Sequence, residues 1–221
     1  MSQMNPEDLW FNTPDTHTLC RAGGNGPDHP SQLYAIKKYV LPMEIASFLD
    51  YGAGSGTTYE ALLKSAAPFY EINYTGVDII PKNTKWCKEQ WPEADWEVNP
   101  SLHKIDQLDK SFDVVYSRHV VDHMKSFEEA MDEHCRVAKK MVIVVLWVPL
   151  SDGDEHQIKN IVDQGKTYQD EYTNSYSREK VMAYLHNKIH EGWRLLEITE
   201  NIKNEDGTSA KHDTVIVLKR V

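Results

Sequence analysis

The feature that most constrains the fold is a glycine-rich turn, Gly52-Ala-Gly-Ser-Gly56, set between a short apolar segment and a helical pattern. Glycines at this spacing allow a tight turn from a strand into a helix and let a ligand approach the backbone closely. The helix that follows presents unsatisfied backbone N–H groups in its first turn. The segment therefore predicts a ligand-binding turn within an α/β domain.

An acidic residue, Asp50, lies two residues before the first glycine and limits the class of ligand that the turn can bind. A nicotinamide-binding turn reads Gly-x-Gly-x-x-Gly and holds a diphosphate, whereas the glycines here lie two apart. A carboxylate beside a diphosphate is unfavourable, but beside an ammonium or sulfonium group it is favourable. A P-loop is excluded because no Gly-Lys-Ser/Thr follows. The turn therefore favours a cationic ligand.

From Ile45 onward, apolar segments alternate with helical patterns, which predicts a parallel sheet covered on both faces. The expected strands are Ala46–Tyr51, Tyr74–Ile79, Trp96–Val98, Phe112–Ser117, Met141–Val148, Trp193–Glu200 and Thr214–Arg220. The expected helices run from Ser31 to just before Pro42, over Thr57–Ala67 and Lys82–Gln90, from a capping box at Ser126 to Ala138, and over Ser177–Ile189.

The last two expected strands break the alternation, because the connection through Asp206-Gly207 is too short for a helical crossover. They should form an antiparallel hairpin. The expected fold is a Rossmann-like three-layer α/β sandwich with a mostly parallel seven-stranded sheet and an antiparallel C-terminal hairpin. Residues 1–44 are expected to form an arm and helix capping the site, and 45–221 the main domain, with 151–176 as a substrate-side insertion.

A second acid, Asp78, ends the second expected strand in Gly76-Val-Asp78, where a carboxylate can accept hydrogen bonds from both ribose hydroxyls. These two motifs, followed by Phe112-Asp-Val-Val-Tyr-Ser-Arg-His-Val-Val-Asp-His123, resemble the consecutive motifs of the class I S-adenosylmethionine-dependent methyltransferases, in particular their small-molecule branch. The resemblance extends from about Ile45 to Pro149. It implies S-adenosylmethionine as cofactor and S-adenosylhomocysteine as product.

The resemblance places the methionine part of the cofactor at Asp50 and the glycine turn, and the ribose at Asp78. The family often has an adenine-binding acid after the third strand. Here Asn99-Pro-Ser-Leu102 stands in its place, so Ser101 or the backbone near Leu102 is expected to hold the adenine. The full expected set of cofactor-binding residues is Asp50, Gly52, Ala53, Gly54, Gly56, Asp78, Ile79, Ser101, Leu102 and Ser117.

Two histidines, His119 and His123, follow the fourth expected strand and would share a face if that segment is helical. A histidine titrates near neutrality, so His119 is the candidate general base and, with His123, a candidate acceptor contact. Histidines four apart also suggest a metal, as do His186 and His190. Neither pair has the Glu of a His-Glu-x-x-His motif or an evident third ligand, so no metal site is expected.

A formal net charge of −10 disfavours nucleic acid as a substrate. No apolar run reaches bilayer length, no signal peptide is visible and three widely spaced cysteines suggest no disulfide framework, so a cytoplasmic monomer or homodimer without a membrane partner is expected. The expected function is methyl transfer from S-adenosylmethionine to an O or N atom of a small molecule. The alternatives are a cofactor-binding protein without catalysis and a nucleotide-dependent oxidoreductase.

Overall fold

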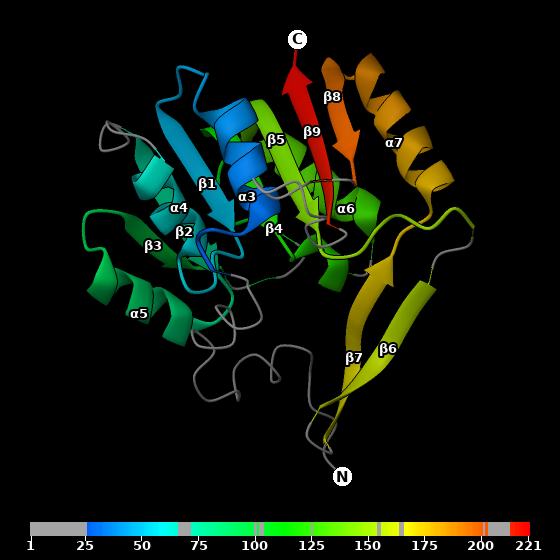
Figure 1. The fold of residues 1–221 in the computed structure, drawn as a ribbon, viewed down its shortest axis with the longest axis horizontal. Coiled ribbons are helices and arrows are strands. Elements are labelled where there is room, and N and C mark those ends of the chain that lie inside the picture. The colour runs from blue at the N-terminus through cyan, green and yellow to red at the C-terminus, as the bar shows by residue number, and fades with distance from the viewer. Residues whose placement is uncertain are drawn as a thin grey trace.

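The computed structural model describes residues 26–65, 72–99, 101, 104–124, 126–153, 156–163, 166–200, 202 and 213–221. These residues form a seven-stranded sheet in the order β3-β2-β1-β4-β5-β9-β8 (Figure 1). Its strands are β1 (Ser47–Tyr51), β2 (Asn73–Asp78), β3 (Asp95–Val98), β4 (Phe112–Arg118), β5 (Ala138–Leu146), β8 (Trp193–Thr199) and β9 (Thr214–Arg220).

The five strands from β3 to β5 pair in parallel, and β9 pairs antiparallel with both β5 and β8. This order confirms the expected Rossmann-like sheet and its antiparallel C-terminal hairpin. The order also reverses between β1 and β4, so the loops after these two strands leave in opposite directions. In open α/β sheets this is where ligands bind, beyond the carboxyl ends of the strands.

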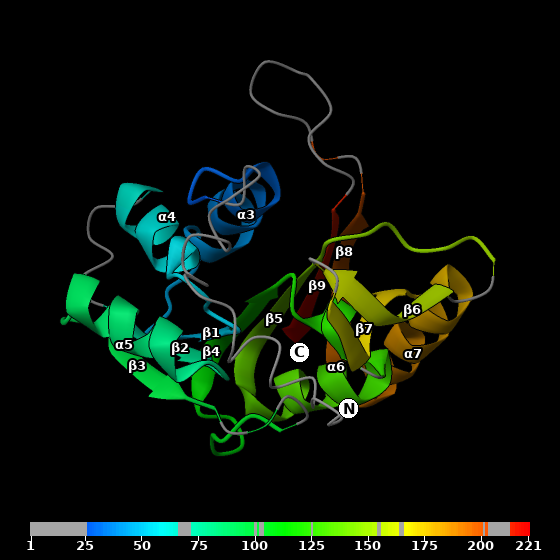
Figure 2. The ribbon, with the colours of Figure 1, turned by 90° about the horizontal axis from the view of Figure 1, so that it is seen from below.

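Helices cover both faces of the sheet, as the view from below shows (Figure 2). Side chains alternate across β1, so Phe48 packs into the core on one face while Leu49 and Tyr51 pack into the core on the other. The first face is covered by α3 (Pro30–Ala35) with the π-helical turn η2 (Ile36–Val40), α4 (Thr57–Ser65) and α5 (Pro81–Gln90). The second is covered by α6 (Phe127–Val137) and α7 (Arg178–His190).

The helix boundaries follow local sequence signals. Ser126 caps α6, because its Oγ accepts the backbone N–H of Glu129 at 3.3 Å, which is half of the expected capping box. Pro30 and Pro81 each occupy the first turn of a helix, where a missing N–H costs no hydrogen bond. The described helices include none with the length and apolar character needed to cross a bilayer.

Several predicted strand bounds differ slightly from the structure, and the clearest error is the start of β5, which lies at Ala138 directly after α6 and not at Met141. Lys139 and Lys140 are exposed at the start of the strand, so they hid it from a reading based on apolar residues. Lys140 forms an ion pair with Asp113 at 3.3 Å, which holds this end of β5 beside β4.

Within the segment expected to be an insertion, the backbone forms a two-stranded antiparallel sheet of β6 (His156–Asp163) and β7 (Lys166–Ser175). Figure 1 shows this hairpin beyond the sheet, on the side toward which the arrowhead of β1 points. Asn174 fastens its last strand by donating to the carbonyls of Asp122 (3.0 Å) and Met124 (2.5 Å). The hairpin is thereby attached to η4 (Val121–His123), the short 3-10 turn after β4.

Candidate functional site

The glycine turn is bound to the end of β2 by backbone hydrogen bonds. The N–H groups of Gly52 and Ala53 both donate to the carbonyl of Val77, at 2.8 and 2.9 Å. Gly52 has a φ of 75°, and a Cβ there would lie 2.2 Å from Cγ2 of Val120. Because a side chain at Gly52 would overlap Val120, the turn and the loop after β4 approach as closely as they do only with glycine.

Asp78 links the turn to the end of β2. Its Oδ2 accepts the N–H of Gly54 at 2.8 Å, and its Oδ1 accepts the N–H of Ile80 at 2.8 Å and the Nδ2 of Asn83 at 3.3 Å. The side chain is buried, and this burial raises its pKa despite the three donors. A carboxylate offers about four acceptor positions, so one remains for a hydroxyl of a ligand. Ile79 beside it is partly exposed.

Asp50 lies inside the domain, with 1% of its surface exposed. It follows Phe48 on the face covered by α4, and its Oδ2 accepts the hydroxyl of Tyr74 at 2.6 Å. Burial raises its pKa to about 6, opposed by hydrogen bonds from Tyr74 and Thr58 and by the charge of Arg118. The carboxylate therefore has a structural partner and offers no open face in this conformation.

Ser117 is also fully buried, and its hydroxyl lies 3.0 Å from Nε2 of His134. Nδ1 of His134 lies 2.6 Å from the carbonyl of Ala130, so both ring nitrogens have partners. Burial lowers the pKa of His134 to about 4, which keeps the ring neutral at pH 7. Ser117 thus faces α6 rather than open surface.

The loop after β3 is organised by Asn99, which sequence reasoning did not single out. Its side chain donates to the carbonyls of Ser101 and of Lys104 (3.0 Å) and accepts the N–H of Asp106 (2.8 Å). Ser101 is partly exposed, and its carbonyl also accepts the hydroxyl of Tyr51 at 3.2 Å. Leu102, the other expected adenine contact, lies outside the described residues.

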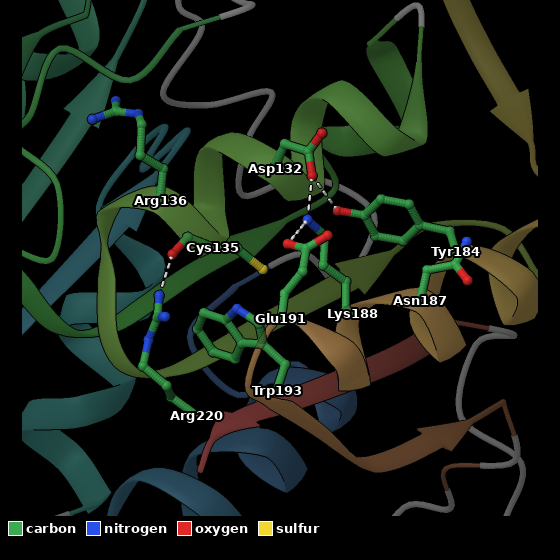
Figure 3. Close-up of a pocket in the computed structure, with 9 residues that line it drawn as sticks. All are labelled: Asp132, Cys135, Arg136, Tyr184, Asn187, Lys188, Glu191, Trp193 and Arg220. Carbon is green, nitrogen blue, oxygen red and sulfur yellow. Dashed lines mark hydrogen bonds and ion pairs between the residues drawn. The ribbon is translucent and has the colours of Figure 1, made fainter.

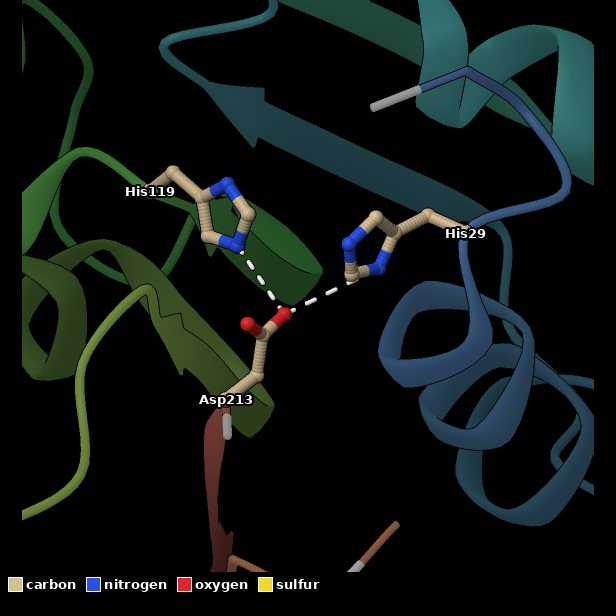
Figure 4. Close-up of side chains that lie close together, drawn as sticks. All are labelled: His29, His119 and Asp213. Carbon is tan, nitrogen blue, oxygen red and sulfur yellow. Dashed lines mark hydrogen bonds and ion pairs between the residues drawn. The ribbon is translucent and has the colours of Figure 1, made fainter. Parts of the chain in front are cut away.

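His119 lies just beyond β4, in a left-handed backbone conformation with a φ of 57°. Its N–H donates to the carbonyl of Val145 at 2.8 Å, and its Nε2 lies 3.0 Å from Oδ2 of Asp213, the residue before β9 (Figure 4). Burial lowers the pKa of His119, although the bond to Asp213 opposes this. Trp147, which is 47% exposed, lies next to it with ring centroids 6.4 Å apart.

His29 and Ser31, at the start of α3, lie beside the same Asp213 carboxylate that His119 contacts. Ser31 Oγ lies 2.6 Å from Asp213 Oδ2 and 2.8 Å from Nδ1 of His29. Burial pushes the pKa of Asp213 up, but the bonds from His119 and Ser31 and the charge of His29 outweigh it, so the pKa is lowered. The carboxyl group is therefore ionised at neutral pH, next to a neutral His119.

His119 and His123 do not share a helical face, because only Val121–His123 is helical and His119 precedes it with a positive φ. His123 is partly exposed at the end of this turn. Sequence reasoning found His119 but missed His29 and Asp213. Asp213 directly precedes the strand expected at Thr214, and His29 lies two residues before the helix expected at Ser31, so only their nearness to the ends of expected elements was a signal.

A separate surface pocket of about 600 Å³ lies between α6, α7 and the β8–β9 pair (Figure 3). Its lysine, Lys188, pairs with both Asp132 and Glu191 at 2.6 Å. Arg220 stacks over Trp193, with its guanidinium carbon 4.2 Å from the ring centroid. None of the expected site residues lines this pocket, and its charges already have partners within the protein.

Comparison with known proteins agrees with this geometry. Residues 49–146 match the family described as "Methyltransferase domain". Among solved structures, a S-adenosylmethionine-dependent methyltransferase from Aquifex aeolicus is 19% identical, with 80% of this chain and 82% of that chain covered and a TM-score of 0.51.

Two further structures resemble the chain in fold. One is a chain of the complex between the Haloferax volcanii Trm112 methyltransferase activator and a methyltransferase (13% identity, 99% of each chain covered, TM-score 0.66). The other is the 1,6-didemethyltoxoflavin-N1-methyltransferase of Burkholderia thailandensis, solved with 1,6-didemethyltoxoflavin and S-adenosylhomocysteine (12% identity, 88% of this chain and 78% of that chain covered, TM-score 0.62).

The sheet order and the glycine turn at the carboxyl end of β1 are typical of α/β domains that bind a nucleoside-containing cofactor where the strand order reverses. The match of residues 49–146 to the methyltransferase-domain family, together with this fold, supports a class I S-adenosylmethionine-dependent methyltransferase, which acts on an acceptor substrate. One residue present fits this cofactor by its chemistry: three donors occupy Asp78, which leaves one acceptor position for a ribose hydroxyl.

Proposed function

We propose that this methyltransferase acts on an O or N atom of a small molecule, with His119 as the general base and Asp213 as the residue that positions it. The supporting observation is the His119–Asp213 pair at the carboxyl end of β4, next to the exposed ring of Trp147. The net charge of −10 argues against a nucleic acid acceptor.

The proposed base follows from the hydrogen bond. When Nε2–H of His119 donates to the ionised Asp213, the lone pair of the neutral ring lies on Nδ1. Nδ1 is then the atom that takes a proton from an acceptor hydroxyl or ammonium group, while Asp213 stabilises the imidazolium that results. A pKa lowered by burial keeps this ring in its basic form at pH 7.

Within this proposal, Asp78 and Ile79 hold the ribose of the cofactor, the backbone from Gly52 to Gly56 holds its methionine part, and Ser101 lies at the adenine. Bound S-adenosylmethionine supplies a methyl group on a sulfonium, which is already activated for in-line displacement. Asp50 contributes through its charge and not by contact, since Tyr74 occupies its carboxylate. The contribution of Ser117 is likewise limited to its backbone, because its hydroxyl is bonded to His134.

The parts that flank the site suit a small acceptor. Gln32 of α3 is fully buried and accepts the hydroxyl of Thr58 in α4 at 3.1 Å, which fixes α3 beside the turn. On the other side, Asn174 attaches the β6–β7 hairpin to the loop that carries His119. We propose that α3, with the rest of residues 1–44, and the insertion 151–176 exclude water from the acceptor side.

The test has two stages. Calorimetric titration with S-adenosylhomocysteine should give micromolar binding, and Asp78→Ala should weaken it by about a hundredfold, which corresponds to about 2.7 kcal/mol. Formation of S-adenosylhomocysteine is then measured with phenols, alcohols and amines, and in parallel with peptides and RNA. Turnover only with a macromolecule would reject the small-molecule acceptor. Binding without turnover on any class would favour a binding protein.

The role of His119 is tested by the pH dependence of kcat. His119→Gln should lower kcat by about 10²-fold or more, the usual contribution of a general base. Asp213→Asn removes the group that raises the pKa of His119, so the acidic limb of the profile should move to lower pH. If His119→Gln left kcat unchanged while cofactor binding was intact, the base would have to be another group.

A further inference from the structure

Three segments far apart in the sequence bring two imidazoles and one carboxylate together at the sheet edge. His29 precedes α3, His119 follows β4 and Asp213 precedes β9, and Figure 4 shows the two rings on either side of the carboxylate. One ligand atom from each of the three lies within 4.8 Å of the other two. The rings meet edge to face, with centroids 5.5 Å apart. Two imidazoles and a carboxylate are a ligand set that divalent zinc takes in proteins.

We infer that His29, His119 and Asp213 form a binding site for a divalent transition metal of the zinc class. The separations of the ligand atoms fit this size of ion. In a tetrahedral site with bonds of about 2.0–2.1 Å, neighbouring ligand atoms lie about 3.3 Å apart. Oδ2 of Asp213 lies 3.0 Å from Nε2 of His119 and 3.7 Å from Nδ1 of His29, on either side of that value. The two imidazole nitrogens lie within 4.8 Å of each other, so binding a tetrahedral ion brings the two rings closer together around the carboxylate.

The burial of Asp213 supports the same site. This side chain is fully buried, and its Oδ1 has no hydrogen-bond partner among the described residues. An ionised carboxylate away from water is costly unless it is paired or coordinates a metal, and the hydrogen bonds from His119 and Ser31 both reach Oδ2 and leave Oδ1 uncompensated.

Ser31 supplies the outer contact that such sites use. Its Oγ donates to Oδ2 of Asp213 at 2.6 Å, which holds the carboxylate in place. Coordination through Nδ1 of His29 exchanges the present bond between that atom and Ser31 (2.8 Å) for a bond to the metal. Hard cations such as Mg²⁺ prefer oxygen ligands, so the site should select against them.

This inference does not depend on the proposed acceptor, because metal binding is measured without cofactor or substrate. It does bear on His119: with Nε2 on a metal, Nδ1 carries the proton and the ring is no longer a base. The three protein ligands leave a fourth tetrahedral position for an acceptor hydroxyl, amine or thiol. The same location then has two states, a base in the absence of metal and a Lewis acid in its presence.

The experiment uses the untagged, chelator-treated full chain, titrated calorimetrically with Zn²⁺ and separately with Mg²⁺. We expect one tight Zn²⁺ equivalent, a visible absorption spectrum typical of tetrahedral Co²⁺ when Co²⁺ is the probe, and no comparable Mg²⁺ binding. Asp213→Asn and His29→Gln should each weaken Zn²⁺ binding by about 100-fold. Two variants of buried residues are used so that the test survives a failure of one of them to fold, and circular dichroism checks the folding of each.

The matched control is a double variant that combines His186→Ala with His190→Ala. These two histidines are exposed on α7, with ring centroids 5.8 Å apart, and form the pair most able to bind Zn²⁺ adventitiously. The control should retain the tight equivalent. The inference is overturned if the wild type binds no Zn²⁺ at micromolar concentrations, if the tight equivalent is lost in this control, or if it persists in a folded Asp213→Asn or His29→Gln variant.

Discussion

Both carboxylate oxygens of Asp122 lie at hydrogen-bonding distance from the backbone N–H of Trp147, Oδ1 at 3.1 Å and Oδ2 at 3.0 Å. This contact joins the 3-10 turn after β4 to the end of β5, directly beside His119. Asp122 is fully buried, and burial raises the pKa of its carboxyl group to about 7. The sequence placed Asp122 between two candidate site residues without indicating this role.

Asp122 should make stability depend on pH. Since its folded pKa lies above the unfolded value of about 3.9, the folded protein binds this proton more tightly. The resulting stabilisation is complete at low pH and is lost as the pH rises through about 7. Relative to Asp122→Asn, which keeps an oxygen for Trp147, the wild type should lose up to about 1.4 kcal/mol per pH unit between about pH 4 and 7. Urea unfolding across this range measures the difference, and parallel curves would refute the prediction.

Three glycine-to-alanine substitutions distinguish two sources of destabilisation, an unfavourable backbone conformation and a steric overlap of the added Cβ. Gly192 has a φ of 83° and no atom within 4 Å of an added Cβ, so Gly192→Ala should cost about 1–2 kcal/mol for the backbone alone. At Gly76 the backbone is ordinary, but the Cβ would lie 2.4 Å from Trp96. At Gly56 both effects apply, because φ is 69° and an added Cβ would lie 2.4 Å from the Trp91 ring.

Gly56→Ala should therefore be the most destabilising of the three, by about the sum of the other two, or roughly 2–5 kcal/mol. Urea unfolding of the three variants tests this. Equal losses for Gly56→Ala and Gly192→Ala would mean that Trp91 moves aside at no cost, although it packs against Tyr59, Trp86 and Trp96.

Ser117→Ala should lower stability but leave cofactor binding unchanged. Removing the hydroxyl leaves Nε2 of the buried His134 without a donor, which costs about 1–3 kcal/mol. Chemical denaturation and titration with S-adenosylhomocysteine measure the two properties separately. Ser111→Ala is a suitable control, because its hydroxyl bonds the Leu108 carbonyl near the surface. A clear loss of affinity for S-adenosylhomocysteine in Ser117→Ala would instead indicate that the Ser117 hydroxyl contacts the cofactor.

Asn174→Ala should loosen the β6–β7 hairpin, because it removes two hydrogen bonds to the loop after β4 and leaves those donated by the Tyr176 hydroxyl. We expect faster cleavage by limited proteolysis within residues 156–175 and a several-fold higher KM for the acceptor, with cofactor affinity unchanged. Ser175→Ala, which removes only an exposed bond to the Pro149 carbonyl, is the control. Unchanged proteolysis and KM would show that the hairpin does not depend on this attachment.

The fold was predictable because its signals are local. Each buried strand is a short apolar run, and each helix has a cap, a proline or a three-to-four-residue apolar spacing that depends only on neighbouring residues. The antiparallel C-terminal hairpin was predicted from the short connection between its two strands. Where a strand carried exposed lysines, as at Lys139 and Lys140, the same reasoning placed its start too late.

The site was less predictable because its contacts join distant segments. Asp213 meets His119 across 94 positions and Ser31 across 182, and no periodicity encodes which strand ends adjoin. Asp50 was expected beside the ligand, but the alternation of β1 turns it toward Tyr74. The roles of Asp78, Ile79, Ser101 and His119 remain predictions that binding and kinetic experiments test.

The position of Asp213 at the head of β9 also has a consequence for folding. Because β9 is antiparallel to β5, its first residues reach the edge where β4 and β5 end, and β9 lies between β5 and β8. A folding intermediate with the parallel strands formed but β9 undocked would contain the glycine turn and lack the His119–Asp213 pair. Docking of β9 would both close the sheet and bring Asp213 to His119, so cofactor binding should appear before methyl transfer during refolding.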